Sequence, residues 1–95
     1  MECERVSFTG HAIQRMFHRG IGLDAVLAIV AHGETVAAYE DDKPYPSRLV
    51  LGFVNARPLH VVVARDELTG DCIVVTAYEP SPEQWGPDFK ARKTS

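Results

Sequence analysis

The chain has 95 residues, of which 45% are hydrophobic and 24% charged, and its formal net charge at pH 7 is −3. This composition is typical of one small globular domain with a modest core. The acidic balance argues against a protein that binds nucleic acid through bulk positive charge, and leaves room only for a local basic site. No apolar run in the sequence is long enough to span a membrane.

Two helices are predicted near the start of the chain, after a short extended lead-in that ends at Phe8. Thr9 is a suitable N-cap for a helix over residues 10–19, and Gly20 followed by Ile21 fits a Schellman ending. A second helix is expected over residues 23–32, because apolar side chains recur there at i, i+3, i+4 and i+7.

From residue 34 onward the hydrophobic pattern becomes that of strands. Four strands are expected, over residues 35–39, 48–54, 58–65 and 72–78, with an acidic, proline-containing loop after the first and an Asn55-Ala56 turn after the second. The short connections favour an antiparallel meander. The predicted fold class is therefore α+β, with two N-terminal helices followed by a four-stranded antiparallel sheet in a single domain.

The ordered core is expected to cover about residues 6–89. Ser81-Pro82-Glu83 predicts one short helical turn that carries Trp85, and the residues from 89 to the end are expected to be frayed. Cys3 and Cys72 show neither a metal-binding spacing nor a disulfide framework, and the first residues lack the apolar stretch of a secretion signal. A reducing, cytoplasmic environment is therefore expected, with no metal and no cofactor.

The first helix carries the most informative pattern in the chain. Four polar side chains fall within one arc of this helix: His11, Arg15, His18 and Arg19. Three apolar side chains lie on the opposite side and are expected to enter the core: Ile13, Met16 and Phe17. Guanidinium groups bind phosphate oxygens, and a histidine can transfer a proton near neutral pH. This arc predicts a binding site for a phosphate-bearing ligand. The alternative interpretation is an ordinary polar face exposed to solvent.

A second polar group is predicted on the last two strands. His60 lies in an apolar strand, where it is either a core histidine with satisfied ring nitrogens or a proton-transfer group. Thr76 and Tyr78 share one face of the last strand by simple alternation.

The turn over residues 66–70 decides whether these side chains meet. If Arg65 pairs with Asp71, His60 lies opposite Thr76 on one face. If Asp66 pairs with Asp71, the two side chains fall on opposite faces, because a shift of one residue reverses every side chain. Both registers remain open at the level of the sequence.

Four segments together resemble a bacterial family known only as domain of unknown function 4258, over about residues 9–89. These segments are His11-x3-Arg15-Met16-x2-Arg19-Gly20-Ile21, the Asp-Asp-Lys-Pro-Tyr-Pro loop, Leu59-His60-Val61-Val62-Val63 and Val75-Thr76-Ala77-Tyr78. That family in turn resembles the barnase–EndoU–colicin–RelE-like group of small ribonucleases, many of which are toxins of toxin–antitoxin pairs.

The resemblance implies a RelE/barnase-like fold and metal-independent cleavage of RNA, in which the 2′-hydroxyl attacks the adjacent phosphate. It implies proton transfer by His11 and by His60 or Tyr78, and phosphate binding by Arg15, Arg19 and Thr76. The implied partners are RNA and a zinc-finger-type antitoxin protein, with no membrane. The alternative is a non-enzymatic interaction module of the same fold that binds a protein partner or RNA.

Overall fold

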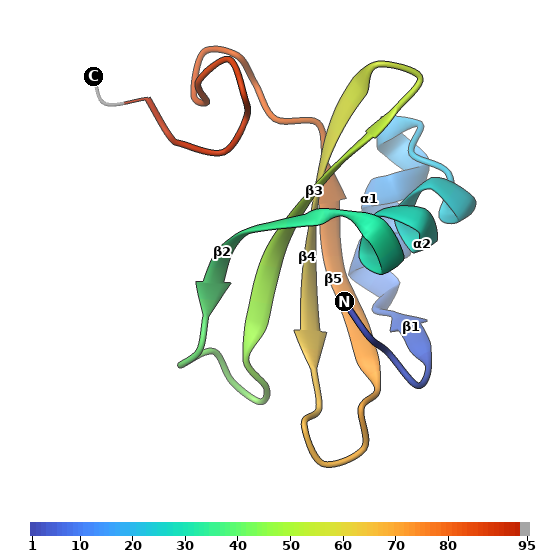
Figure 1. The fold of residues 1–95 in the computed structure, drawn as a ribbon. Helices are drawn as coiled ribbons and strands as arrows, with labels where there is room; N and C mark the ends of the chain where they lie inside the picture. Colours follow the sequence, from blue (N-terminus) through green and yellow to red (C-terminus); the bar gives the residue numbers. More distant parts are fainter. Residues whose placement is uncertain (94–95) are drawn as a thin grey trace.

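Two helices lie on one face of a five-stranded sheet in the computed structural model, which describes residues 1–93 (Figure 1). The elements in chain order are β1 (Val6–Phe8), α1 (Gly10–Arg19), α2 (Leu23–His32), β2 (Glu34–Tyr39), β3 (Ser47–Val54), β4 (Arg57–Arg65) and β5 (Cys72–Tyr78). The strands are arranged in the order β1-β5-β4-β3-β2. Within residues 1–93, neither helix is long and apolar enough to cross a membrane.

The lead-in to the first helix is itself a strand. β1 pairs with β5 in parallel, with Val6 opposite Cys72 and Phe8 opposite Val74. The predicted α+β class is confirmed, but the predicted four-stranded, wholly antiparallel sheet that follows two helices is wrong. The extended lead-in that ends at Phe8 is predicted, but three residues are too few for the alternating pattern that would identify a paired strand.

The local signals at the ends of α1 are confirmed. The side chain of Thr9 accepts a hydrogen bond from the backbone N–H of Ala12 at 2.9 Å. Gly20 has a φ of 64°, and the N–H of Ile21 donates to the carbonyl of Met16 at 2.9 Å. These are the bonds of a Schellman ending, and they place the side chain of Ile21 in the core.

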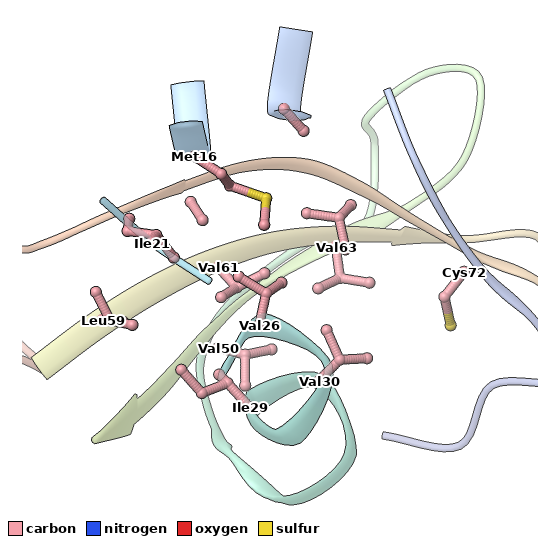
Figure 2. Packing of buried hydrophobic residues seen from close by; sticks show 13 residues of the cluster. Met16, Ile21, Val26, Ile29, Val30, Val50, Leu59, Val61, Val63 and Cys72 are labelled. Atoms are coloured by element: carbon pink, nitrogen blue, oxygen red, sulfur yellow. The ribbon is translucent and has the colours of Figure 1, made fainter. Parts of the chain in front are cut away.

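The hydrophobic core lies between the helices and the sheet (Figure 2). α1 packs on β5, and α2 packs across β3 and β4. The sheet contributes alternate residues of its central strands to this layer, among them Val50, Leu59, Val61, Val63 and Val74. The opposite face of the sheet carries the intervening residues.

Residues 80–93, which we call the C-terminal strap, follow β5 and lie on the side of the sheet away from the helices, as Figure 1 shows in orange and red. The N–H groups of Gln84 and Trp85 both donate to the carbonyl of Ser81 at 3.0 Å, which is the predicted turn. The N–H of Lys93 donates to the carbonyl of Gln84 at 2.8 Å, so the segment that is predicted to be frayed is hydrogen-bonded as far as residue 93. The last two residues of the predicted frayed segment lie outside the described residues.

Cys3 and Cys72 form a disulfide, which corrects the expectation that they are unpaired. The two residues are 69 positions apart in sequence, and β1 brings them together by pairing with β5. Disulfides persist in oxidising environments. The prediction of a reducing compartment rested on unpaired cysteines, so this pairing removes its basis.

Candidate functional site

α1 presents a different side to the sheet from the one its pattern predicts. Ala12 and Met16 are buried, whereas Ile13 is 46% exposed and Phe17 is 83% exposed. The prediction that Ile13 and Phe17 enter the core is therefore wrong, and only Met16 of that stripe does so. The helix lies against β5 through the small side chain of Ala12, which turns Phe17 toward solvent.

The basic arc of α1 runs from solvent to the outer edge of β5. His11, Arg15 and His18 are exposed. The Nη1 atom of Arg19 donates to the carbonyl of Ala77 at 2.8 Å. Since Ala77 stands between Thr76 and Tyr78, Arg19 brings the end of the predicted helix arc to the strand residues that the sequence singled out.

This edge of β5 is bonded to the start of α1 by the backbone and the side chain of Thr9. The N–H of Thr9 donates to the carbonyl of Val74 at 3.2 Å, and its hydroxyl donates to the carbonyl of Val75 at 3.4 Å. Beyond β1, the edge of β5 is therefore bordered by α1 in place of another strand. The arrangement holds the Arg19 side of α1 along the strand end.

Arg57 fixes the other end of α1. Its guanidinium donates to the carbonyls of Gly20 and Arg19, both at 3.1 Å, and forms an ion pair with Glu79. The last carbonyls of a helix carry partial negative charge, so a cation there is favourable. Arg57 thus helps to position the end of α1.

His60 is a buried histidine with both ring nitrogens satisfied. Its Nε2 atom is 2.8 Å from the carbonyl of Phe89, to which it donates, and its Nδ1 atom lies 3.2 Å from the hydroxyl of Tyr78. In the neutral ring, Nδ1 accepts a hydrogen bond from that hydroxyl. Burial lowers the pKa of His60 below its ordinary value, and the hydrogen bond to Phe89 opposes this shift. The geometry matches the core-histidine alternative of the two that the sequence left open.

Tyr78 is held as a neutral phenol. Burial raises its pKa above the ordinary value, the nearby Tyr39 raises it further, and the positive charge of Arg92 acts in the opposite direction. Its ring meets that of His60 edge to face, with 5.3 Å between the centroids. In this arrangement Tyr78 is a hydrogen-bond donor to His60 and not a free acid.

A bulge sets which strand residues share a face. Near the turn, Arg65 pairs with Cys72, but the register shifts between Val62 and Val63, and His60 then pairs with Tyr78. Val62 pairs with Thr76. Thr76, Tyr78 and His60 therefore share one face, although neither simple register predicts the observed pairs.

The six predicted site residues thus form two groups. His11 and Arg15 lie on α1, which packs on the helix-covered face of the sheet, whereas His60 lies on the opposite face. The sheet separates the two histidines, and the structure does not bring them into one cleft. Arg19 lies between the groups at the edge of β5.

Four aromatic side chains mark the sheet face away from the helices, one on each of four neighbouring strands: Tyr39, Phe53, His60 and Tyr78. Tyr39 is 43% exposed and Phe53 58% exposed. We call this set the aromatic face. Phe53, His60 and Tyr78 lie near one end of this face, whereas Tyr39 pairs with Ser47 toward the other end. Aromatic rings on a sheet surface are suited to stacking against planar groups.

The strap supplies contacts to this face that the sequence did not predict. The ring centroids of Trp85 and His60 are 4.5 Å apart, and those of Phe89 and Phe53 are 6.4 Å apart. Arg92 lies over Trp85, 5.3 Å from its ring centroid. The single tryptophan of the chain was the available signal, but its position on a short turn did not indicate which strand it would cover.

A cavity of about 700 Å³ lies where the end of β4 meets the loop between β2 and β3, away from His60 and Trp85. It is lined by residues such as Met1, Tyr45, Arg48, Arg65 and Leu68, and by none of the six predicted site residues. Among residues 1–93, no group of three or more histidine, cysteine or acidic side chains is placed to hold a metal ion.

Comparison with known proteins assigns the chain to a family. No curated protein and no solved structure matches the chain significantly. The family model that matches is described as "Domain of unknown function (DUF4258)", and the match covers residues 8–79, from the end of β1 to the residue after β5. The chain therefore belongs to this family of domains of unknown function.

Proposed function

We propose that this chain binds single-stranded RNA along the outer edge of β5 and cleaves it without a metal ion, as a toxin-like endoribonuclease. The observation that carries the proposal is the position of Arg19. It is held on the carbonyl between Thr76 and Tyr78 while His11 and Arg15 lie on the solvent side of the same helix.

The cations supply the phosphate contact. Of the nitrogens of Arg19, Nη1 is used by Ala77, and among the described residues no other partner of its guanidinium is recorded. The remaining N–H groups of Arg19, together with Arg15 one turn earlier, are arranged to bind phosphate oxygens. Thr76 is half-buried at the same strand end and offers a hydroxyl.

His11 is the proposed base. It removes the proton of the 2′-hydroxyl, the 2′-oxygen forms a bond to the adjacent phosphorus, and the bond from phosphorus to the 5′-oxygen breaks. The 5′-oxygen takes a proton from water, which leaves a 2′,3′-cyclic phosphate and a 5′-hydroxyl. The arginines stabilise the added negative charge on the phosphate in the transition state.

His60 and Tyr78 have a different part in this proposal from the one that the family resemblance implies. Both ring nitrogens of His60 are hydrogen-bonded and burial lowers its pKa, so we assign no proton transfer to His60 or Tyr78 in this structure. Together they shape the aromatic face beside the phosphate contact.

A cleavage assay on labelled single-stranded RNA in the presence of EDTA tests the proposal. We expect the wild type to give products with cyclic phosphate ends, and His11→Ala to lose activity by roughly 10²- to 10⁴-fold. Arg15→Ala should also be impaired, whereas Arg48→Ala, which removes an exposed arginine on β3, should cleave normally. The corresponding single-stranded DNA, which lacks the attacking 2′-hydroxyl, should stay intact.

The outcome against the proposal is equally direct. Wild-type protein that leaves several unstructured RNAs intact, and that does not inhibit growth when it is expressed, would exclude the nuclease. Equal cleavage by wild type and His11→Ala would exclude His11 as the base.

A second candidate function is favoured by the exposed apolar side of α1. Ile13 and Phe17 are one turn apart and project from the same side of the helix, with Phe17 83% exposed. Apolar side chains grouped on a surface are typical of a protein contact. We propose this side as the docking site of a partner protein, such as a zinc-finger-type antitoxin in a toxin–antitoxin pair. Phe17→Ser should abolish pull-down of such a partner and leave RNA cleavage unchanged.

A further inference from the structure

The C-terminal strap makes few bonds to the sheet that it covers. Its backbone hydrogen bonds are internal, such as the bond from the N–H of Gly86 to the carbonyl of Ala91 at 2.8 Å. Within residues 1–93, no backbone hydrogen bond joins the strap to a strand. Its recorded polar links to the sheet are the bond between His60 and the carbonyl of Phe89, and an exposed ion pair between Lys90 and Glu34.

The strap covers the aromatic face with rings of its own. Trp85 is only 6% exposed, and its indole meets His60 edge to face. Phe89 lies against Phe53, and its carbonyl accepts the hydrogen bond from His60. An aromatic ring beside His60, with a carbonyl oxygen on Nε2, is what a nucleobase that carries a carbonyl group would offer to the same surface.

The strap also lies outside the part of the chain that defines the family. The matched region ends at residue 79, and the strap begins at the next residue. Phe89 has a φ of 60°, a backbone region that is unfavourable for residues other than glycine. A segment with this strain and so few hydrogen bonds to the sheet is expected to detach without unfolding of the strands, at the cost of exposing Trp85 and His60.

We propose that the strap is an autoinhibitory segment, which occupies the aromatic face as a ligand mimic and must detach before unpaired RNA bases can stack there. The proposal rests on the proposed function for the identity of the ligand. Detachment of the strap itself is a property of the free protein, and it is measured without RNA.

Hydrogen exchange in the free protein tests the detachment. The amides of Gly86 and Lys93, both bonded inside the strap, should exchange faster than those of Val61 and Val63 in β4, and at low denaturant concentration they should exchange independently of global unfolding. If the strap amides exchange only when the whole protein unfolds, the strap is an integral part of the fold and the proposal is wrong.

Binding of fluorescein-labelled hexauridylate with 2′-O-methyl groups, which block the proposed cleavage, is followed by anisotropy and tests the inhibition. If the strap is open for about one tenth of the time, its removal from the face tightens the apparent affinity by about tenfold. Trp85→Ala in the full chain should show this gain, and Phe89→Ala provides a second, less buried substitution if the first does not fold. Tyr45→Ala, in the loop between β2 and β3, is the matched aromatic control and should bind like the wild type.

The outcomes separate the two proposals. Equal or weaker binding by a folded strap variant, relative to a wild type that binds, overturns the autoinhibition. Independent exchange of the strap, with no binding of hexauridylate by any variant, overturns the RNA function and with it the ligand assigned to the aromatic face.

Discussion

Replacement of His60 by alanine is expected to be one of the most destabilising single changes in this domain. The substitution removes a fully buried ring and two hydrogen bonds, to Tyr78 and to the carbonyl of Phe89. A lost hydrogen bond costs about 1 kcal/mol, and truncation of a large buried side chain adds the cost of the cavity. We expect a loss of about 3–4 kcal/mol, a large part of the roughly 5–15 kcal/mol that such a domain possesses.

Urea unfolding followed by far-UV circular dichroism measures this loss, and His11→Ala provides the matched control. His11 is an exposed histidine on the surface of α1, so its replacement should change the free energy of unfolding by no more than about 0.5 kcal/mol. The reasoning is refuted if His60→Ala costs less than about 1 kcal/mol, because the buried hydrogen bonds would then contribute little. A similar loss for His11→Ala would refute the assignment of His11 as a free surface group.

Three further predictions concern pH, the disulfide and the end of α1. Burial lowers the pKa of His60 in the folded state below its ordinary value of 6.5, so the unfolded chain binds the proton first. The free energy of unfolding should therefore fall as the pH drops below about 6.5. Urea unfolding at a series of pH values should show this decline, which should be much smaller in His60→Gln. Reduction of the disulfide between Cys3 and Cys72 opens a loop of 69 positions and should cost about 4 kcal/mol, measured as the difference between urea midpoints with and without a reductant; an unchanged midpoint would show that the pair does not stabilise the fold. Gly20→Ala places a side chain at a φ of 64° and should cost about 1 kcal/mol in the same assay, whereas Gly22→Ala, at a negative φ, should cost less.

The elements that could be predicted from the sequence are those fixed by local chemistry. Thr9 caps α1 and Gly20 ends it because each satisfies backbone groups within a few residues. Asn55 and Ala56 both take positive φ values, of 50° and 68°, as a two-residue hairpin turn requires. These signals need no knowledge of the rest of the chain.

The orientation of α1 could not be predicted in the same way. Its hydrophobic pattern favours the side that carries Ile13, Met16 and Phe17, yet the helix meets the sheet through Ala12 and Met16. The reason lies outside the helix, because Thr9 and Arg19 bond to the edge of β5 and so fix the rotation of the helix between them. An apolar stripe on an isolated helix gives no information about such contacts.

Long-range pairing accounts for the other differences. β1 has only three residues, and the sequence shows no pattern that links Cys3 to a strand almost 70 positions later. The strap depends on two such contacts, from Trp85 and Phe89 to strands far away in sequence. Neither kind of contact follows from local propensity or periodicity.

The register of β4 and β5 shows how narrowly the candidate site depends on one residue. The N–H of Asp66 donates to the carbonyl of Asp71 at 2.9 Å, which is the register expected to place His60 and Thr76 on opposite faces. The bulge beside Val62 adds one residue to β5 and reverses that outcome, so that His60 pairs with Tyr78. The bulge thus joins His60 to Tyr78, while the sheet keeps both apart from His11. Of the predicted site residues, Arg19 is the one that lies between the two groups, because it bonds to the carbonyl of Ala77 at the edge of β5.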